Sequence, residues 1–404
     1  MGAKSGAALP CYTRDRSACD LQRAGGFQRR RQLDLASWQG GSSTVLSVTL
    51  DVAGSAPTTI NTPVCSSIGA GPFAVGDVNN DKKPDVVMSC TGYIAVLIGK
   101  GDGTFQAPVY YANQGGTYTT PALVDLKGDG YLDVAIVTAL GNTTSLTVYL
   151  NEGSAAPGTY GAPKNYSLGP VSGAIYGPVS GDFNGDGKQD LLVLTDTNLI
   201  VSYGNGDDTL QAAQTQALPT STNFQTAAVG DFNHDGATDV AYTALSECCS
   251  PGVPGNVQIL LGSSNGVFAK GTTLSIEPSP LVPSVAATQL TNDGNLDLIT
   301  SGNGITTVFR GDGKGGFTQG ASYGASGVPI VGDLNGDGKP DLLLEALGTP
   351  TGAGFYLLYG NGGHIPRSAN RTNEHQWKYG LRGFKRGRNR RCRIPDLCAG
   401  CQRG

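Results

Sequence analysis

Histidine is scarce in this sequence, with three among 404 residues, and only His234 lies between residues 41 and 362. The same stretch contains a single arginine, Arg310. General acid–base catalysis uses histidine, carboxylate, lysine or tyrosine side chains gathered in a pocket, and recognition of acidic sugars also needs cations. The sequence has neither a Gly-x-Ser-x-Gly nucleophile motif nor a phosphate-binding P-loop. These absences argue against most classes of enzyme.

Long apolar segments are also absent. No run of 18 apolar residues occurs, so we expect no transmembrane helix, and the first 20 residues lack the apolar core of a signal peptide. Glycine is abundant, with 61 residues, but it follows no Gly-X-Y period, which excludes collagen. Because 39% of the residues are hydrophobic, the chain is too apolar to be mostly disordered.

Charge is unevenly distributed along the chain, whose net charge is −4. Residues 1–40 carry +4, residues 41–362 carry −17, and residues 363–404 carry +9. We therefore divide the chain into an atypical basic N-terminal segment, an acidic body and a basic tail that we expect to be disordered. The tail is rich in arginine between Lys385 and Arg393, but it has no folded reader domain, so a nucleic-acid-binding arm is the weaker interpretation.

Internal repeats are the main signal in the body. Six segments align, among them SGDFNGDGKQDLLVL from Ser180 and VGDLNGDGKPDLLLE from Val331. The last aspartate of each segment recurs every 44 to 58 residues, at Asp85, Asp133, Asp190, Asp239, Asp297 and Asp341. Such a period is typical of one supersecondary unit that is repeated in a solenoid or a propeller.

Each unit has the pattern of four short β-strands. In residues 71–112, apolar runs at Phe73–Val75, Val86–Met88, Ile94–Ile98 and Phe105–Tyr111 are separated by glycine-rich or acidic turns. We predict an all-β fold, a β-propeller of four-stranded blades with six intact repeats and seven blades in all. A two-domain sandwich would explain the strands but not the regular acidic loop between the first two strands of each unit.

The acidic loop reads Asp-x-Asn-x-Asp-Gly-x-x-Asp in its fullest form. Oxygen ligands at positions 1, 3 and 5, a glycine at position 6 and a main-chain carbonyl at position 7 suit Ca²⁺, and we expect an acid at position 9 to close the site. The flanking strands disfavour an EF-hand, which closes at position 12 between helices. The predicted calcium ligands are Asp77, Asn79, Asp81, Lys83 and Asp85; Asp125, Asp129, Tyr131 and Asp133; Asp182, Asn184, Asp186, Lys188 and Asp190; Asp231, Asn233, Asp235, Ala237 and Asp239; Asp293 and Asp297; and Asp333, Asn335, Asp337, Lys339 and Asp341.

Two of the six loops depart from this pattern enough to weaken the expected site. The second has Lys127 at position 3, and the fifth has Gln289 and Thr291 at positions 1 and 3. The first has Lys82 in place of glycine but keeps its acids. An ordinary turn rich in aspartate, asparagine and glycine is the alternative for any single copy. Six copies in register favour structural calcium, which stabilises the folded state by mass action.

The motifs resemble those of the FG-GAP/VCBS repeat family, whose founding fold is the seven-bladed propeller of integrin α chains. The segments GDFNGDGKQD at 181–190 and GDLNGDGKPD at 332–341 match the family's calcium loop, and Tyr160–Pro163 and Phe105–Pro108 resemble its Phe-Gly and Gly-Ala-Pro signature. The resemblance covers about 65–362. It implies an extracellular or surface-exposed calcium-binding propeller, but it does not imply a ligand.

The ends of the chain carry traces of further repeats. Leu33–Ser37 matches the strand that follows an acidic loop, and Asp34 lies one period before Asp85, but Gln28–Arg31 replaces the acidic motif. Codons for Asn-Gly-Asp-Gly read in another frame can give Gln-Arg-Arg-Arg. Ile394–Leu397 lies about one period after the last repeat. We therefore hypothesise that both ends are partly out-of-frame translation, which sequencing of the gene would test.

The nine cysteines include Cys65 and Cys90, which flank the first acidic loop and suggest a disulfide within one blade of an exported protein. Buried free thiols are the alternative. The C-x-x-C at Cys398 and Cys401 has no second pair, so zinc is disfavoured.

Two function classes remain after these exclusions. The first is a non-catalytic binding or adhesion module with a protein or glycan ligand. In such a module, exposed tyrosines such as Tyr110, Tyr111, Tyr118 and Tyr176 would stack on sugars. Packing between blades is, however, the commoner fate of an aromatic residue. The second is a propeller-based polysaccharide lyase or hydrolase, for which a pair such as Glu247 and Glu345 would have to meet in the central funnel.

Overall fold

The computed structural model describes most of the acidic body and parts of the N-terminal segment. The described residues are 20–25, 34–39, 44–50, 58–65, 72–113, 119–140, 143–171, 173–219, 223–245, 255–276, 284–291, 293–302, 305–324, 329–333, 337–346 and 354–360. In these ranges the only helix is a single 3₁₀ turn at Gly153–Ala155, and none is long and apolar enough to span a membrane.

The described strands form seven antiparallel sheets in chain order, six of four strands and one of three. The first three sheets are β1 (Asp20–Gly25), β2 (Asp34–Gln39), β3 (Thr44–Leu50) and β4 (Thr58–Cys65); β5 (Phe73–Gly76), β6 (Asp85–Cys90), β7 (Tyr93–Leu97) and β8 (Val109–Ala112); and β9 (Ala122–Val124), β10 (Asp133–Leu140), β11 (Thr143–Tyr149) and β12 (Lys164–Gly169). The other four are β13 (Ile175–Gly181), β14 (Asp190–Thr195), β15 (Asn198–Ser202) and β16 (Gln214–Ala217); β17 (Asn223–Gly230), β18 (Asp239–Leu245), β19 (Gly255–Leu261) and β20 (Ala269–Ile276); β21 (Ser284–Thr288), β22 (Asp297–Gly302), β23 (Ile305–Gly311) and β24 (Phe317–Tyr323); and β25 (Pro329–Gly332), β26 (Asp341–Ala346) and β27 (Gly354–Leu358).

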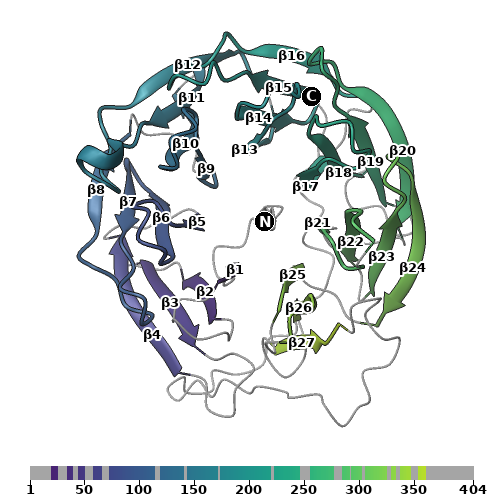
Figure 1. The fold of residues 1–404 in the computed structure, drawn as a ribbon, viewed down its shortest axis with the longest axis horizontal. Helices are drawn as coiled ribbons and strands as arrows, with labels where there is room; N and C mark the ends of the chain where they lie inside the picture. The colour runs from purple at the N-terminus through teal and green to yellow at the C-terminus, as the bar shows by residue number, and fades with distance from the viewer. Residues whose placement is uncertain are drawn as a thin grey trace, which may run out of the picture.

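The sheets are arranged around a central axis as the blades of a propeller (Figure 1). The first strand of each sheet lies innermost and contacts the first strands of both neighbouring sheets, and β1 contacts β25, so the ring of inner strands is closed. This arrangement confirms the predicted all-β propeller of antiparallel blades, and it excludes a pair of sandwiches.

Burial within a sheet is greatest in the second strand, intermediate in the innermost strand and least in the outer strand. Every residue of β6 and of β14 is buried, and a run of three or four apolar residues follows the first aspartate of each strand. Strands β8 and β16 at the outer rim are mostly exposed. The apolar core lies between neighbouring sheets rather than on the axis, as the cluster that joins Leu192 to Tyr242 illustrates. This explains why the second strands read as runs and not as alternating patterns.

A disulfide joins Cys65, the last residue of β4, to Cys90, the last residue of β6. The two strands belong to different sheets, so the expectation that this bond would lie within one blade is wrong. The reason is the position of the boundary between the sheets. The sheet that contains the first acidic loop begins with β5, and Cys65 lies before β5, in the preceding sheet. The bond therefore ties the first two sheets to each other.

Asp34 begins β2, as its spacing from the acidic repeats predicts, and its side chain is buried. Strands β1 and β2 form one sheet with β3 and β4, so the first sheet includes residues on both sides of the predicted boundary at residue 41. Gln28–Arg31, Ile394–Leu397 and the basic tail lie outside the described residues, as do Tyr118 and Glu247.

Candidate metal centres in the acidic loops

All six acidic loops join the first strand of a sheet to its second strand, as the repeat pattern predicts. They lie along one edge of the ring, where loops of neighbouring sheets touch. The amide of Thr238 donates to the carbonyl oxygen of Asp182 in the preceding loop at 2.6 Å. His234 and Asn295 from the next two loops approach at 3.0 Å between Nε2 and Oδ1. These two contacts join the third, fourth and fifth loops to one another.

Within a full loop, the side chains at positions 1, 3 and 5 turn inward onto the loop's own backbone. In the loop after β13, the amide of Asp186 donates to Oδ1 of Asp182 and to Oδ1 of Asn184, both at 3.1 Å. The amide of Gly187 donates to Oδ2 of Asp182 at 2.8 Å, and that of Lys188 donates to Oδ1 of Asp186 at 3.0 Å. Equivalent bonds order the loops of Asp77, Asp231 and Asp333.

Position 6 needs a left-handed backbone, and Gly187 adopts it with φ of +81°. In the first loop Lys82 adopts the same conformation with φ of +65°, which costs an L-residue about 1–2 kcal/mol. Its amide still donates to Oδ2 of Asp77, at 2.6 Å. The substitution therefore leaves the shape of the loop intact at an energetic cost.

The aspartate at position 9 has a different environment from the other acids. Asp190 is fully buried at the start of β14, and its two oxygens accept amides from Phe183 at 2.8 Å and from Gly204 at 2.8 Å. The first amide belongs to the loop, and the second follows the third strand of the same sheet. The same two bonds recur at Asp85, Asp133, Asp239 and Asp297, and the bond to the third strand recurs at Asp341.

Burial raises the pKa of these carboxyl groups. It raises the pKa of Asp85, Asp133 and Asp190 to about 6 and that of Asp239 to about 7, and it raises the pKa of Asp297 as well. Desolvation is the main cause, because it disfavours the charged form, while the two amide bonds oppose it. Through their two amide bonds, these aspartates hold the loop and the third strand together. Sequence reasoning assigned them only to calcium, although the glycine that follows the third strand is a signal of this contact.

Lysines compensate part of the charge at position 5. The ammonium group of Lys83 lies 2.8 Å from Oδ2 of Asp81, and that of Lys188 lies 3.8 Å from Oδ2 of Asp186. Lys339 pairs with Asp337 at 4.0 Å. These pairs are largely solvent-exposed and are therefore weak. A calcium ion would compete with them for the same carboxylates.

The second loop carries its own cation. The ammonium group of Lys127 lies 3.4 Å from Oδ2 of Asp129 and 4.0 Å from Oδ2 of Asp208, which belongs to the next sheet. Asp125 accepts the amides of Gly128, Asp129 and Gly130. Lys127 therefore links two blades at a position where the four fuller loops have an uncharged asparagine.

The fifth loop lacks the aspartate at position 1 and the asparagine at position 3. Asp297 accepts the amides of Leu290 and Thr291 at 3.1 and 3.3 Å, and Asp293 accepts the amide of Asn295 at 2.9 Å. The loop is thus closed by its own backbone contacts. Asn335 of the sixth loop lies outside the described residues.

The donor chemistry of the four fuller loops fits calcium, because each offers only hard oxygen donors from the first half of the loop. In the part of the chain that the structure describes, no three histidine, cysteine, aspartate or glutamate side chains surround a common metal position. The carboxylates are directed to different partners: Asp182 and Asp186 accept amides of the loop, while Asp190 accepts the buried amides of Phe183 and Gly204. The residues that would hold calcium are those at positions 1, 3 and 5, with the carbonyl at position 7.

Comparison with known proteins decides the family. The model for the FG-GAP-like repeat matches residues 77–136, 129–193, 182–242 and 289–344, which is more than half of the chain. The chain belongs to the FG-GAP-like repeat family. Among curated proteins no match is found.

Solved structures with the propeller fold are similar to this FG-GAP-like chain. A lectin from Agrocybe aegerita that recognises non-reducing terminal N-acetylglucosamine is 17% identical to this chain. The matched region covers 81% of this chain and 87% of the lectin chain, with a TM-score of 0.54. A chain of the structure of BBS1N in complex with ARL6DN is 12% identical. The match covers 90% of this chain and 99% of that chain, with a TM-score of 0.53. The NanB sialidase from Streptococcus pneumoniae is 11% identical. The match covers 85% of this chain and 65% of the sialidase chain, with a TM-score of 0.41. At these identities the likeness concerns the fold.

Proposed function

We propose that this protein is an extracellular or cell-surface calcium-binding propeller that acts as a non-catalytic binding or adhesion module, with calcium in a mainly structural role. The observation that carries the proposal is the repeated loop geometry. In the loops of Asp77, Asp182, Asp231 and Asp333, backbone amides hold the oxygens of the predicted ligands on one short turn.

The position of the loops explains why calcium would stabilise the fold. Each loop joins two strands of one blade, and the bond from Thr238 to Asp182 connects the third loop to the next blade. An ion held there neutralises carboxylates that otherwise repel one another in a body of charge −17. Because the ion binds the folded state only, it shifts the unfolding equilibrium toward that state.

An exported location agrees with the disulfide between Cys65 and Cys90, since such bonds persist in oxidising compartments. Calcium at millimolar concentration is also a property of the extracellular space. A glycan ligand is part of the proposal, supported by the shared fold of a lectin and by an exposed aromatic pocket described below.

The alternative of a polysaccharide lyase or hydrolase has less support. It would need acid and base groups in a common pocket. The pocket described below is lined by glycine, alanine and two tyrosines, and the side chain of Glu152 is exposed to solvent. Glu247 and the side chain of Glu345 lie outside the described residues, so the candidate pair gains nothing from the structure.

Thermal unfolding of the full chain, stripped with EGTA and measured with and without millimolar CaCl₂, tests the proposal. We expect calcium to raise the unfolding temperature clearly, and the double variant Asp186→Ala with Asp235→Ala to lose much of that shift. Asp293→Ala in the incomplete fifth loop is the matched control, and its shift should equal that of the wild type. An unchanged unfolding temperature in calcium would refute the structural role of the ion.

A further inference from the structure

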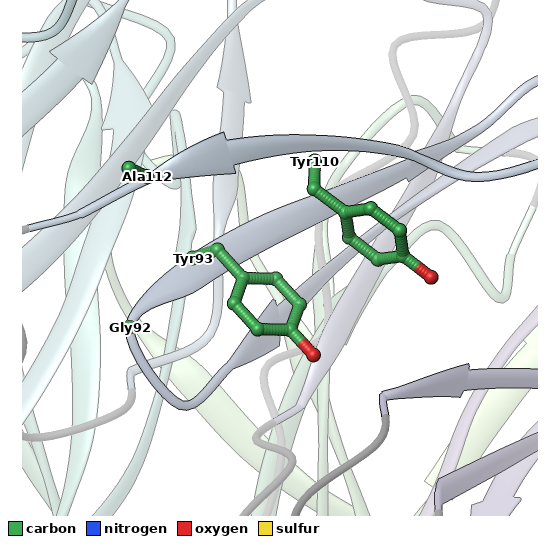
Figure 2. A pocket seen from close by; sticks show the side chains of 4 residues that line it. All are labelled: Gly92, Tyr93, Tyr110 and Ala112. Carbon is green, nitrogen blue, oxygen red and sulfur yellow. The ribbon is translucent and has the colours of Figure 1, made fainter.

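A pocket of about 450 Å³ lies at the outer part of the second sheet, and its lining residues are Gly92, Tyr93, Tyr110 and Ala112 (Figure 2). Gly92 forms the turn between β6 and β7, Tyr93 begins β7, and Tyr110 and Ala112 belong to β8. No charged side chain lines the pocket. Its volume is within the range of small-molecule sites.

The two tyrosines form one rigid aromatic corner. Their ring centroids are 5.1 Å apart and the ring planes meet at 82°, which is an edge-to-face contact. Figure 2 shows both rings projecting to the same side of the sheet, with their hydroxyl oxygens at the same end. Tyr110 is 51% exposed although it is a large aromatic residue. An exposed aromatic face in a concave site is a common element of ligand recognition.

Bonds to the first sheet hold this corner in place. The hydroxyl group of Tyr110 donates to the carbonyl oxygen of Val64 in β4 at 2.8 Å. The next residue, Cys65, forms the disulfide with Cys90, which pairs with Tyr93 across the β6–β7 turn. The aromatic corner therefore spans the junction of two blades and is ordered before any ligand arrives, which lowers the entropic cost of binding.

The repeat itself does not require tyrosine at these places. Tyr110 lies opposite Ala95 in the register of β7 and β8. At the same position, three other blades have Asn165 opposite Thr147, Thr215 opposite Ile200, and Thr273 opposite Gln258. The counterparts of Tyr93 in five other blades are Val45, Ser145, Asn198, Asn256 and Ile305. None of these counterparts is aromatic, so the tyrosine pair is a local addition to the fold.

We propose that the Tyr93–Tyr110 pocket binds one uncharged pyranose unit of a glycan. The inference deepens the proposed binding function and rests on it. A pyranose presents an apolar C–H face that packs on an aromatic ring, and its hydroxyl groups suit the polar rim of tyrosine hydroxyl and main-chain groups. The uncharged lining disfavours sialic and uronic acids, which need a cation.

A proline-rich peptide fits the pocket less well. Such peptides lie as extended helices along grooves lined by successive aromatic residues. Here four residues from one turn and two adjacent strands form the lining, and the two rings are nearly perpendicular.

The test uses the full chain in calcium, screened against immobilised neutral glycans that end in galactose, glucose, mannose or N-acetylglucosamine. Titration calorimetry with the best monosaccharide then gives an affinity. We expect Tyr110→Ala and Tyr93→Ala to weaken binding at least tenfold. Ala112→Phe, which fills the pocket and keeps both tyrosines, should do the same. Thr215→Ala changes the equivalent position of another blade and should bind as the wild type does.

The outcomes separate this proposal from the wider one. Glycan binding that survives in Tyr110→Ala and Ala112→Phe would overturn the pocket and leave a glycan-binding module with another site. Binding of anionic sugars only, or of proline-rich peptides only, would overturn the uncharged pyranose. A wild type that binds no glycan while calcium still raises its unfolding temperature would overturn the pocket and leave the calcium role in place. The calcium shift of each variant also shows that it is folded.

Discussion

The amide of Gly204 donates a hydrogen bond of 2.8 Å to Oδ1 of Asp190 and so connects the end of the third strand of a blade to the start of its second strand. A Cβ atom at Gly204 would overlap the carbonyl oxygen of Gln189, the residue before the aspartate. Glycine is therefore required at this point by the close approach of two backbone segments.

Gly204→Ala should destabilise the protein by about 1–3 kcal/mol, because the backbone must shift to admit the methyl group. Gly161→Ala is the control, since nothing lies within 4 Å of a Cβ atom there and its φ is not positive. Urea unfolding of both variants measures the effect. Equal stability of the two variants would contradict the proposed close approach.

Asp190 and Asp186 should respond differently to the removal of calcium. Asp190→Ala leaves the buried amides of Phe183 and Gly204 without acceptors, and we expect a loss of about 3 kcal/mol even in EGTA, since each unsatisfied group costs about 1–3 kcal/mol. Asp186→Ala affects an exposed turn and should lower stability mainly in calcium. Unfolding curves in EGTA and in CaCl₂ compare them. A loss at Asp190 that appears only in calcium would show that this residue acts as a ligand alone.

Lys127→Asn should create an additional calcium site in the second loop. The change removes the ammonium group near Asp129 and Asp208 and supplies the oxygen donor that fuller loops have at position 3. Titration calorimetry should show one more calcium ion per chain. The same variant with Asp125→Ala should return to the original stoichiometry, and an unchanged stoichiometry in Lys127→Asn would refute the role given to Lys127.

Lys82→Gly should stabilise the first loop by about 1 kcal/mol, because glycine adopts the left-handed conformation of this residue without steric cost. Lys82→Ala makes the same change in charge but keeps the unfavourable backbone, so it is the matched control. Thermal unfolding in calcium should rank the glycine variant above the alanine variant. The reverse order would show that charge, and not conformation, dominates at this position.

Much of the architecture could be predicted because each repeat carries its own signals. The runs after Asp85 and Asp190 are buried second strands, and the acidic turns lie where the spacing predicts. Asp34 begins a strand of the first sheet although its loop has lost the motif, because the apolar pattern after it is preserved.

The remaining features depend on contacts between distant segments. The disulfide joins two blades, which the spacing of Cys65 and Cys90 could not reveal. The second bond of Asp190 comes from a glycine beyond the third strand. Of the four tyrosines considered for sugar stacking, Tyr111 packs against Tyr149 and Tyr160, and Tyr110 stays exposed. Their fates depend on the neighbouring blade and not on local pattern. The calcium sites stay a prediction.

Closure of the ring by β1 and β25 has a consequence for biosynthesis. The N-terminal blade leaves the ribosome first, yet the blade that covers its free flank is made last. Until then the nascent chain is an open arc with an uncovered sheet at each end, and exposed apolar flanks of this kind promote association with other chains. The interval before the arc closes is therefore when the protein most needs protection by chaperones.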